Sequence, residues 1–599
     1  MLKRSEPKLM VQLSDNALRV LQARYLRRDA TGQVLETPED MFARVADAIA
    51  QAEVAFGHPD RVSYWRDEFY QLMTSLTFLP NSPTLMNAPG GQLSACFVLP
   101  VEDSIEAIFR AITEMALVQR SGGGTGFSFS RLRPKGDFVA STGGEASGPV
   151  SFMKIFDCAT EHIRRGGRRR GANMGILRVD HPDILEFIAA KLDGVSLQNF
   201  NLSVGVTDAF MEAVCQGTSY DLVHPKTGRT GKQLRAMEVF EAITDAAWRT
   251  GDPGLLFLDA INRANPTPHL GAIEATNPCG EVPLLPYESC NLGSLNVALL
   301  ISERNGRPVV DWERLRTSVR LVVRFLDNVI EVNHYPTPET SRMAQGNRKI
   351  GLGVMGLADL LIRLGLSYDS DQAIELAEQL MRTIAEEARV ASQALAEERG
   401  VFPNWSGSIY ERQGLRLRNA TCTAIAPTGT ISIIAGTSAS IEPLFALAYR
   451  RRHTLGGEGL VEVKKKLLLD YCTWHGLNTE KVIAEVQKRG RLAGVPGLPD
   501  EATRLFVTAL DVPVERHLQI QAAFQCHVDN SVSKTINLPQ EAVPAEVARA
   551  YRRAWELGLK GVTIYRYGSK DSQVFELGIG EEAFQYDHAS TCDRQECRL

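Results

Sequence analysis

The 599-residue sequence lacks a charge excess of one sign. Its 66 Lys and Arg residues face 71 Asp and Glu residues, which leaves a formal net charge of −5. A net charge this small for the length predicts no overall attraction to nucleic acid or to acidic membranes. Any function that needs positive charge must therefore be local.

The sequence also lacks an apolar run suited to cross a membrane. The stretch 419–441 carries no charged residue, but Pro427, two glycines and many Ser and Thr residues interrupt it. We expect a buried, polar-lined strand and loop there. The opening residues MLKRSEPKLMVQLSD carry charges where an export signal needs an apolar segment, so we expect a cytoplasmic protein. In that compartment the ten cysteines are expected to be reduced, except in catalytic disulfides.

The texture of the sequence divides the chain into three parts. Residues 1–74 predict a helical N-terminal region. Residues 75–567 alternate short apolar runs with helical patterns between Gly and Pro clusters, which indicates an α/β domain. Residues 568–599 are polar and acidic, which is typical of a flexible tail.

Several helices can be placed from their end signals. Ser14 and Thr37 are suited to begin helices in the N-terminal region. Two long amphipathic helices are expected near 311–333 and 372–399. The charged segment 452–515 is expected to be a helical insertion.

A glycine motif, IGLGVMG at 350–356, matches the dinucleotide-binding pattern G-x-G-x-x-G. That pattern counts only when it follows a buried hydrophobic strand, and the preceding QGNRK is not one. We therefore reject dinucleotide binding and expect close packing of a Gly-rich strand onto a helix.

Five arginines lie within seven residues, around Gly166 and Gly167. They are Arg164, Arg165, Arg168, Arg169 and Arg170. Such a cationic loop is suited to bind phosphate groups. Nucleic-acid binding would need a wider basic surface with stacking aromatic residues. A nucleotide-phosphate loop is our hypothesis, and a solvated charge run is the alternative.

A second anion-binding candidate is PTGTIS at 427–432, which offers hydroxyl groups and backbone N–H groups at a turn. Such turns are common and most bind nothing, so this segment alone decides little.

The segment NPCGE places an amide, a thiol and a carboxylate at alternating positions, Asn277, Cys279 and Glu281. In an extended chain these side chains point to one side. The alternative is a buried structural cysteine beside a solvated glutamate.

Other cysteines give that segment more weight. Cys96, Cys290 and the terminal pair Cys592 and Cys597 allow a thiol relay, in which a mobile pair passes oxidation to solvent by exchange. Zinc bound by the terminal pair and His588 is the rival interpretation, but a fourth ligand is missing nearby. We expect no metal site. The remaining cysteines are expected to be packing residues, namely Cys158, Cys215, Cys422, Cys472 and Cys526.

Eight segments, in order, resemble the ribonucleotide reductases, specifically class II, the adenosylcobalamin-dependent class. They are LPNSPTLMN, SACFVLP, SGGGTGFSFSRLRPKGD, RRGANMGILRVDHPDI, ATNPCGE, ESCNLGSLN, APTGTISII and HVDNSVSKTINLP. The resemblance implies a ten-stranded α/β barrel of two antiparallel five-stranded halves, with a central finger loop that carries NPCGE.

The resemblance also implies roles for the reactive residues. Cys279 would become the thiyl radical that removes the 3′-hydrogen of a ribonucleotide. Glu281 would act as base on the 3′-hydroxyl, and Asn277 would hold the ribose hydroxyls. Cys96 and Cys290 would reduce the 2′-position and become a disulfide. A nucleotide-binding regulator that kept the fold would be expected to lack one of these residues, but all are present.

Further binding residues follow from the same resemblance. Cys592 and Cys597 would re-reduce the internal disulfide and would be reduced by thioredoxin or a similar dithiol. The substrate phosphates would lie at Ser82, Ala95, Thr428, Gly429, Thr430, Ile431 and Ser432. A deoxynucleotide or ATP effector would lie near Arg133, Lys135, Asp137, Arg164 and Arg170. We expect diphosphate substrates in preference to triphosphates. Family members occur as monomers and dimers, and we expect a homodimer.

Departures from other classes sharpen the assignment. Class I subunits carry an adjacent tyrosine pair for radical transfer, whereas the matching place here reads Tyr565 followed by Arg566. No glycyl-radical motif follows residue 560, and no D-x-H-x-x-G cobalamin motif or ATP-cone pattern occurs. We therefore expect a locally generated radical and specificity control alone. A class I-like subunit with a separate radical generator is the alternative.

Overall fold

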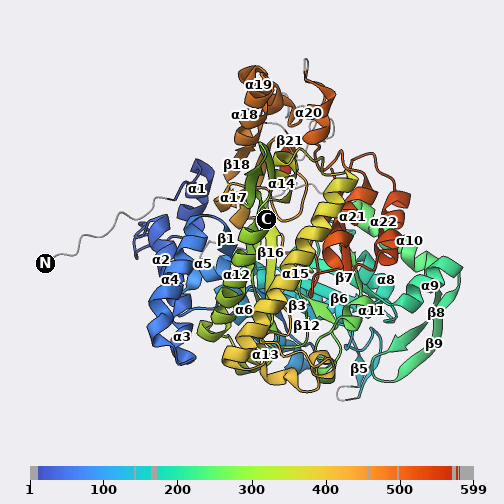
Figure 1. Cartoon of the computed structure of the whole chain (residues 1–599). Coiled ribbons are helices and arrows are strands. Elements are labelled where there is room, and N and C mark those ends of the chain that lie inside the picture. Colours follow the sequence, from blue (N-terminus) through green and yellow to red (C-terminus); the bar gives the residue numbers. More distant parts are fainter. Residues whose placement is uncertain are drawn as a thin grey trace.

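The computed structural model describes residues 11–140, 143–163, 171–455, 458–495, 498–569, 575–577 and 579. The N-terminal region is helical and lies on one side of the molecule, blue in Figure 1. Its helices are α1 (Asp15–Arg24), α2 (Pro38–Ala50), α3 (Ala52–Ala55) and α4 (Val62–Thr74). Ser14 caps α1 by accepting the N–H of Ala17, and Thr37 forms a capping box with Asp40 at the start of α2. Both expected helix starts are confirmed.

The first half of the central sheet consists of five parallel strands. They are, in order, β2 (Cys96–Val98), β3 (Gly124–Ser128), β6 (Asn173–Arg178), β7 (Phe200–Val206) and β10 (Gly254–Phe257). Helices α6 (Ile105–Ser121), α7 (Pro149–His162) and α10 (Ala236–Thr250) connect neighbouring strands, as crossovers between parallel strands require.

The second half also runs parallel within itself. Its members are β20 (Gly561–Arg566), β19 (Thr535–Leu538), the segment 421–425, β16 (Ile350–Met355) and β13 (Ser289–Asn296). Single bridges from Leu352 to Thr423 and from Ile425 to Val532 hold 421–425 in place. The short β1 (Phe78–Pro80) extends the sheet along β13.

The two halves meet in antiparallel fashion twice, β10 with β20 and β13 with β2. These two junctions close the strands into a ring. The sheet is thus the expected ten-stranded barrel of two antiparallel halves, with 421–425 as one of its members and β1 outside the ring.

Long helices cover the second half of the barrel. In Figure 1, α12 (Trp312–Val332) and α15 (Asp371–Arg399) lie side by side across the front. Ser370 caps α15 by accepting the N–H of Ala373, and the helix ends at Gly400, so both long helices are confirmed. The outer shell also contains α13 (Pro338–Asn347), α14 (Leu357–Arg363), α21 (Val514–Gln525) and α22 (Pro544–Glu556).

Smaller elements decorate this frame. They include α5 (Ser82–Asn87), α8 (Ile184–Ala189), α9 (Asp208–Gln216), α11 (Leu258–Arg263), α16 (Ile409–Arg412) and α17 (Ile431–Ala435). Two-stranded ribbons are formed by β4 (Phe138–Val139) with β5 (Gly144–Glu145), β8 (Ser219–His224) with β9 (Gly228–Arg235), and β14 (Ile301–Arg304) with β15 (Arg307–Val310). Among the described residues, no helix is long and apolar enough to cross a bilayer.

The expected helical insertion at 452–515 is corrected at its start. Strands β17 (Ala448–Leu455) and β18 (Glu458–Val463) form a hairpin, which β21 (Phe575–Leu577) extends. Helices α18 (Lys465–Trp474), α19 (Thr479–Arg489) and α20 (Asp500–Leu505) follow. The Gly456-Gly457 pair between two short runs is a hairpin signal that the helical interpretation overlooked.

The glycine motif at 350–356 is itself a buried strand, β16. A Cβ at Gly353 would come within 2.4 Å of the Ala424 carbonyl oxygen, and a Cβ at Gly351 within 2.9 Å of the Ala424 Cβ. The close packing that we expected is therefore present: β16 packs against helix α12, and its glycines also admit the neighbouring segment 421–425.

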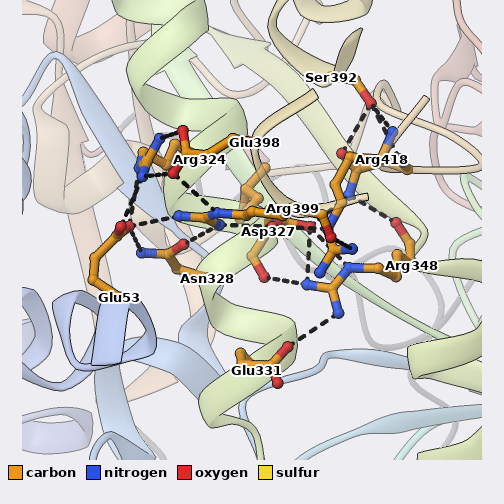
Figure 2. Close-up of polar contacts among 12 residues, drawn as sticks. Glu53, Arg324, Asp327, Asn328, Glu331, Arg348, Ser392, Glu398, Arg399 and Arg418 are labelled. Carbon is orange, nitrogen blue, oxygen red and sulfur yellow. Dashed lines mark hydrogen bonds and ion pairs between the residues drawn. The ribbon is translucent and has the colours of Figure 1, made fainter. Parts of the chain in front are cut away.

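A buried ion-pair network joins the N-terminal helices to the barrel (Figure 2). Glu53 of α3 pairs with Arg324 of α12 at 2.7 Å and with Arg399, at the end of α15, at 2.6 Å. Asp327, fully buried, pairs with Arg399 at 2.9 Å and with Arg348 at 2.9 Å. Each acid is thus shared between at least two arginines, which ties together four separate stretches of chain, namely α3, α12, the residue after α13 and the end of α15.

Candidate active site

A hairpin carries NPCGE into the barrel. Its arms are β11 (Ala275–Thr276) and β12 (Pro283–Leu284), and Asn277 closes the turn by accepting the Val282 N–H at its side-chain oxygen, 3.0 Å away. Gly280 adopts φ +82°, which favours glycine at this tight bend. The backbone of Ser531, from the opposite half of the barrel, donates to the Glu281 carbonyl at 2.9 Å. The loop is therefore fixed at the centre of the ring, as the resemblance predicted.

Two glycines of β3 make room for this hairpin. A Cβ at Gly126 would lie 1.7 Å from the Thr276 carbonyl oxygen, which no neighbouring backbone could accommodate. A Cβ at Gly124 would lie 2.7 Å from the Pro278 side chain. At the tip, Asn201 of β7 donates its side-chain N–H to the Pro278 carbonyl at 2.7 Å. The loop thus lies against two positions of β3 that have no side chain, and the Asn201 amide and the Ser531 backbone hold it there.

Three of the expected reactive residues are packed together. Asn277 donates its amide to the Cys96 sulfur at 3.1 Å, and the Cys96 thiol faces a Glu281 carboxylate oxygen at 4.0 Å. All three are buried. Cys279, by contrast, is exposed at the tip of the loop. Asn277 and Glu281 therefore lie on one side, as expected of alternating residues, while Pro278 and Gly280 turn the chain so that Cys279 is exposed yet still acts electrostatically on Cys96.

Cys96 and Cys290 face each other across two strands. They are directly opposite in the antiparallel register of β2 and β13, and their residues are 3% and 1% exposed. Opposite residues in such a pair place their Cβ atoms about 4.5–5.5 Å apart. The two thiols can therefore form a disulfide after small rotations of their side chains.

Burial dominates the protonation of this site. It raises the pKa of the Glu281 carboxyl from its usual 4.5 to about 7, against hydrogen bonding that lowers it. One oxygen of this carboxylate, Oε2, has no hydrogen-bond partner among the described residues. Burial also raises the pKa of the Cys96 thiol, with the Glu281 charge adding to the rise. The site therefore keeps its thiols protonated and holds a carboxyl that titrates near neutral pH.

A cavity of about 480 Å³ opens beside Cys279. One wall is the apolar edge of β10 and β20, with Leu256, Val562 and Ile564. Lys534 and Glu442 also line the cavity and form an ion pair at 2.7 Å. Sequence reasoning missed these two, although Lys534 lies in the motif HVDNSVSKTINLP.

Two of the seven expected phosphate-binding residues line the same cavity. Gly429 and Ser432 line it, with Thr430 and Ile431 between them at the start of α17. Thr428 adopts φ +51° and accepts the Ser440 N–H at its hydroxyl, which fixes the turn. Helix α17 packs against α1 and β1, close to the Ser82 hydroxyl that bonds Tyr25 at 2.7 Å.

Among the described residues, the others that we expected to bind substrate or effector do not line this cavity. Ala95 donates its backbone N–H to the Cys290 carbonyl at 3.2 Å. Arg133 pairs with Asp103 at 2.8 Å, Lys135 with Glu186 at 3.4 Å, and Asp137 with His224 at 3.2 Å. Arg164, Arg170, Cys592, Cys597 and His588 lie outside the described residues.

Tyr565 and Arg566 diverge. Tyr565 lines the cavity, whereas the Arg566 guanidinium lies over the Trp248 ring, 4.3 Å from its centroid, and donates to the Trp248 carbonyl. The second position therefore offers no aromatic ring toward the cavity.

Comparison with known proteins agrees with this geometry. The ribonucleotide reductase barrel domain matches residues 94–565, and the all-alpha domain of the same family matches residues 11–91. Each match covers one of the two regions described above. The chain belongs to the ribonucleotide reductase family.

Its relatives define the class more narrowly. A vitamin B12-dependent ribonucleoside-diphosphate reductase of Thermoplasma acidophilum is 48% identical over 96% of this chain and 83% of its own length. One of Mycobacterium tuberculosis is 51% identical over 94% of this chain and 81% of its own. The class II assignment made from the motifs is thereby confirmed. In fold, the alpha subunit of an Actinobacillus ureae class Id reductase matches with a TM-score of 0.75 at 24% identity, over 94% of this chain and 99% of its own.

Proposed function

We propose that the chain reduces ribonucleoside diphosphates, in preference to triphosphates, to 2′-deoxyribonucleotides by thiyl-radical chemistry with adenosylcobalamin. The observation that carries this proposal is the finger loop, which packs Asn277 and Glu281 against Cys96 while Cys279 faces the cavity. The names of the relatives at about half identity support the diphosphate substrate and the vitamin B12 dependence.

Glu281 is the base in this proposal. A carboxyl with a pKa of about 7 is poised to accept the proton of the 3′-hydroxyl, because general bases work best near the operating pH. Its unpartnered Oε2 can accept that hydroxyl directly. The Asn277 amide lies beside it and can hold the ribose hydroxyls, while the Cys279 sulfur on the cavity side removes the 3′-hydrogen.

Cys96 and Cys290 supply the two electrons. As the 2′-hydroxyl leaves as water, their thiols deliver hydrogen to the 2′-position and become a disulfide. Their direct opposition in β2 and β13 supports this pairing, since no residue separates them. Cys96 and Cys290 are only 3% and 1% exposed, and this burial protects the intermediate steps from bulk water.

The cavity beside Cys279 fits the reactive end of adenosylcobalamin. Leu256, Val562 and Ile564 form an apolar wall of this cavity that would suit a stacked base. When bound, the cofactor supplies the one-electron oxidation of the Cys279 thiol. Class II chemistry thus needs no second subunit for radical transfer, which agrees with the outward turn of Arg566.

Other partners follow from the same assignment. The turn at Thr428–Ser432 would bind the substrate phosphates, and an effector nucleotide would bind near Arg133. The tail pair Cys592 and Cys597 would pass electrons from thioredoxin or a similar dithiol, in the cytoplasm. Exposed apolar side chains on the packed helices α6 and α7 support a homodimer, namely Ile105, Phe109 and Ile155.

The test is anaerobic turnover of CDP and CTP by the purified chain with dithiothreitol and effectors, with and without adenosylcobalamin. We expect dCDP only with the cofactor, and loss of product by at least about 10³-fold in Cys279→Ser, whose fold circular dichroism would verify. Product that appears only after a radical-generating subunit is added would establish the class I-like alternative. Preferential formation of dCTP would overturn the diphosphate assignment.

A further inference from the structure

A second buried ion pair lies next to the redox cysteines and is used by none of the roles above. Lys349 donates to the Glu288 carboxylate at 2.7 Å, and both side chains are 1% exposed. Glu288 also accepts the Leu285 N–H at 2.6 Å and the Asn347 amide. The carboxylate is therefore fully satisfied. In the described part of the chain, Glu288 is the hydrogen-bond partner of the Lys349 ammonium.

The strand register places this pair beside Cys290. Glu288 and Cys290 are two residues apart, so their side chains share one face of the chain. Lys349 directly precedes Ile350, which lies opposite Asn291, so Lys349 comes alongside Cys290 across the parallel pair of β13 and β16. A Cβ at Gly351, two residues on, would lie 3.5 Å from the Cys290 sulfur, which confirms that this face of β16 looks toward it.

The two redox sulfurs consequently differ in their surroundings, because a cation is among the main charges that act on Cys290 but not among those that act on Cys96. Cys96 faces the Glu281 carboxylate at 4.0 Å, and this negative charge disfavours a thiolate there. Burial strongly raises the pKa of the Cys290 thiol and so disfavours its thiolate. The charge of Lys349 lowers this pKa and is the strongest of the neighbouring charges, whereas Glu281 and Glu288 raise it. Lys349 also acts on a second buried group, since it joins burial in lowering the pKa of Lys560 to about 8.

We propose that Lys349, held in place by Glu288, is a positioning residue for re-reduction of the Cys96–Cys290 disulfide, where its ammonium stabilises the thiolate that leaves from Cys290. This rests on the disulfide pairing in the proposed function. The thiolate of an external dithiol attacks the Cys96 sulfur, the Cys96–Cys290 bond breaks, and Cys290 leaves with the electron pair. The second thiol of the reductant then frees Cys96 and becomes oxidised to its own disulfide, while Cys290 takes up a proton.

The experiment measures disulfide opening without cofactor or substrate. In a Cys592→Ser plus Cys597→Ser background, the internal pair is oxidised with diamide and its identity is checked by peptide mapping. Reopening by dithiothreitol is then followed by alkylation and mass spectrometry. Lys349→Met is expected to slow opening about tenfold, which corresponds to about 1.4 kcal/mol of thiolate stabilisation. Lys349→Arg, which keeps the cation, is expected to restore the rate to within about threefold.

Matched controls separate charge from structure. Glu288→Gln breaks the same ion pair but keeps the cation, so it should not slow opening. If the pair were structural, both variants would loosen the core and speed opening. Unchanged or faster opening in Lys349→Met, or equal slowing in Glu288→Gln, would overturn the proposal. Should Lys349→Met not fold, the double variant Lys349→Met plus Glu288→Gln removes both buried charges and should still open about threefold slower, since Lys349 outweighs Glu288 at Cys290.

The outcome is independent of the reaction class. Failure to form the Cys96–Cys290 disulfide on oxidation would contradict the pairing and the proposed function together. Formation of the disulfide with no effect of Lys349 would contradict this inference alone.

Discussion

Two buried carboxylates of this protein have opposite surroundings. Asp327, fully buried, receives Arg348 and Arg399 at 2.9 Å, Arg418 at 3.5 Å and the Asn419 amide at 3.1 Å. These arginines outweigh burial and lower its pKa to about 2. Glu281 is nearly as deeply buried, but no described residue places a cation beside it, and its pKa is raised to about 7.

This difference shows that burial alone does not decide the protonation state of a carboxylate. A carboxylate with its charge and lone pairs matched is locked in one protonation state and serves to join segments, as in Figure 2. A carboxylate with an unmatched oxygen can change its protonation state, because neither form is strongly held. The first arrangement supports the fold and the second supports chemistry.

The largest change in the free energy of unfolding is expected when Asp327 is replaced. Asp327→Asn leaves three arginines buried around a neutral amide and is expected to cost about 3–5 kcal/mol of the free energy of unfolding. Urea unfolding measures this loss. The control is Asp245→Asn, which removes an exposed ion pair with Arg249 at 2.9 Å and should cost about 0.5 kcal/mol or less. Equal losses in the two variants would refute the role given to the network.

A smaller difference between the two carboxylates is expected in how the free energy of unfolding depends on pH. The folded-state pKa of Glu281 is raised from 4.5 to about 7, so its contribution to stability is complete below pH 4.5 and is lost as pH rises through 7, about 3 kcal/mol in all. Asp327 has the opposite sign. Its pKa is lowered from 3.8 to about 2, so its contribution, about 2 kcal/mol, is present above pH 3.8 and is lost as pH falls toward 2.

The measurement is the unfolding free energy as a function of pH for the wild type and Glu281→Gln, which mimics the protonated carboxyl. The wild type should lose stability relative to Glu281→Gln between pH 5 and 8. Parallel curves over that interval would show that the Glu281 pKa is not raised.

The smallest effect on stability is expected from Glu281→Gln at pH 6. With no ion pair to lose, the variant should unfold within about 1 kcal/mol of the wild type. Its turnover should nevertheless fall about 10²–10⁴-fold, because the base is gone. Thermal unfolding and the anaerobic CDP assay measure the two quantities on one sample, and a large loss of stability would place Glu281 in the same class as Asp327.

Much of this molecule could be predicted because its signals are local. Ser14, Thr37 and Ser370 cap helices through neighbours three residues away, and NPCGE carries its reactive groups within five residues. The ten-stranded barrel of two antiparallel halves was expected from the family resemblance alone, since short apolar runs do not specify their partners.

The features that were missed depend on distant partners. Glu53 meets Arg324 across 271 positions, and Lys349 meets Glu288 across 61. No periodicity links such residues, so each looks like an ordinary surface charge in the sequence. The exposure of Cys279 could not be predicted for another reason, because the side on which a Pro and Gly loop turns is set by the strands around it.

Strand β3 bears on how such proteins are judged from their reactive residues. The finger loop can lie against β3 because Gly124 and Gly126 have no side chains that would occupy its place. One methyl group at Gly126 would displace Asn277, Cys279 and Glu281 together while leaving every one of them in the sequence. A chain can therefore keep every reactive side chain and still be an inactive homologue. The residues at the positions of Gly124 and Gly126 would distinguish such a chain from an active enzyme, whereas the reactive residues would not.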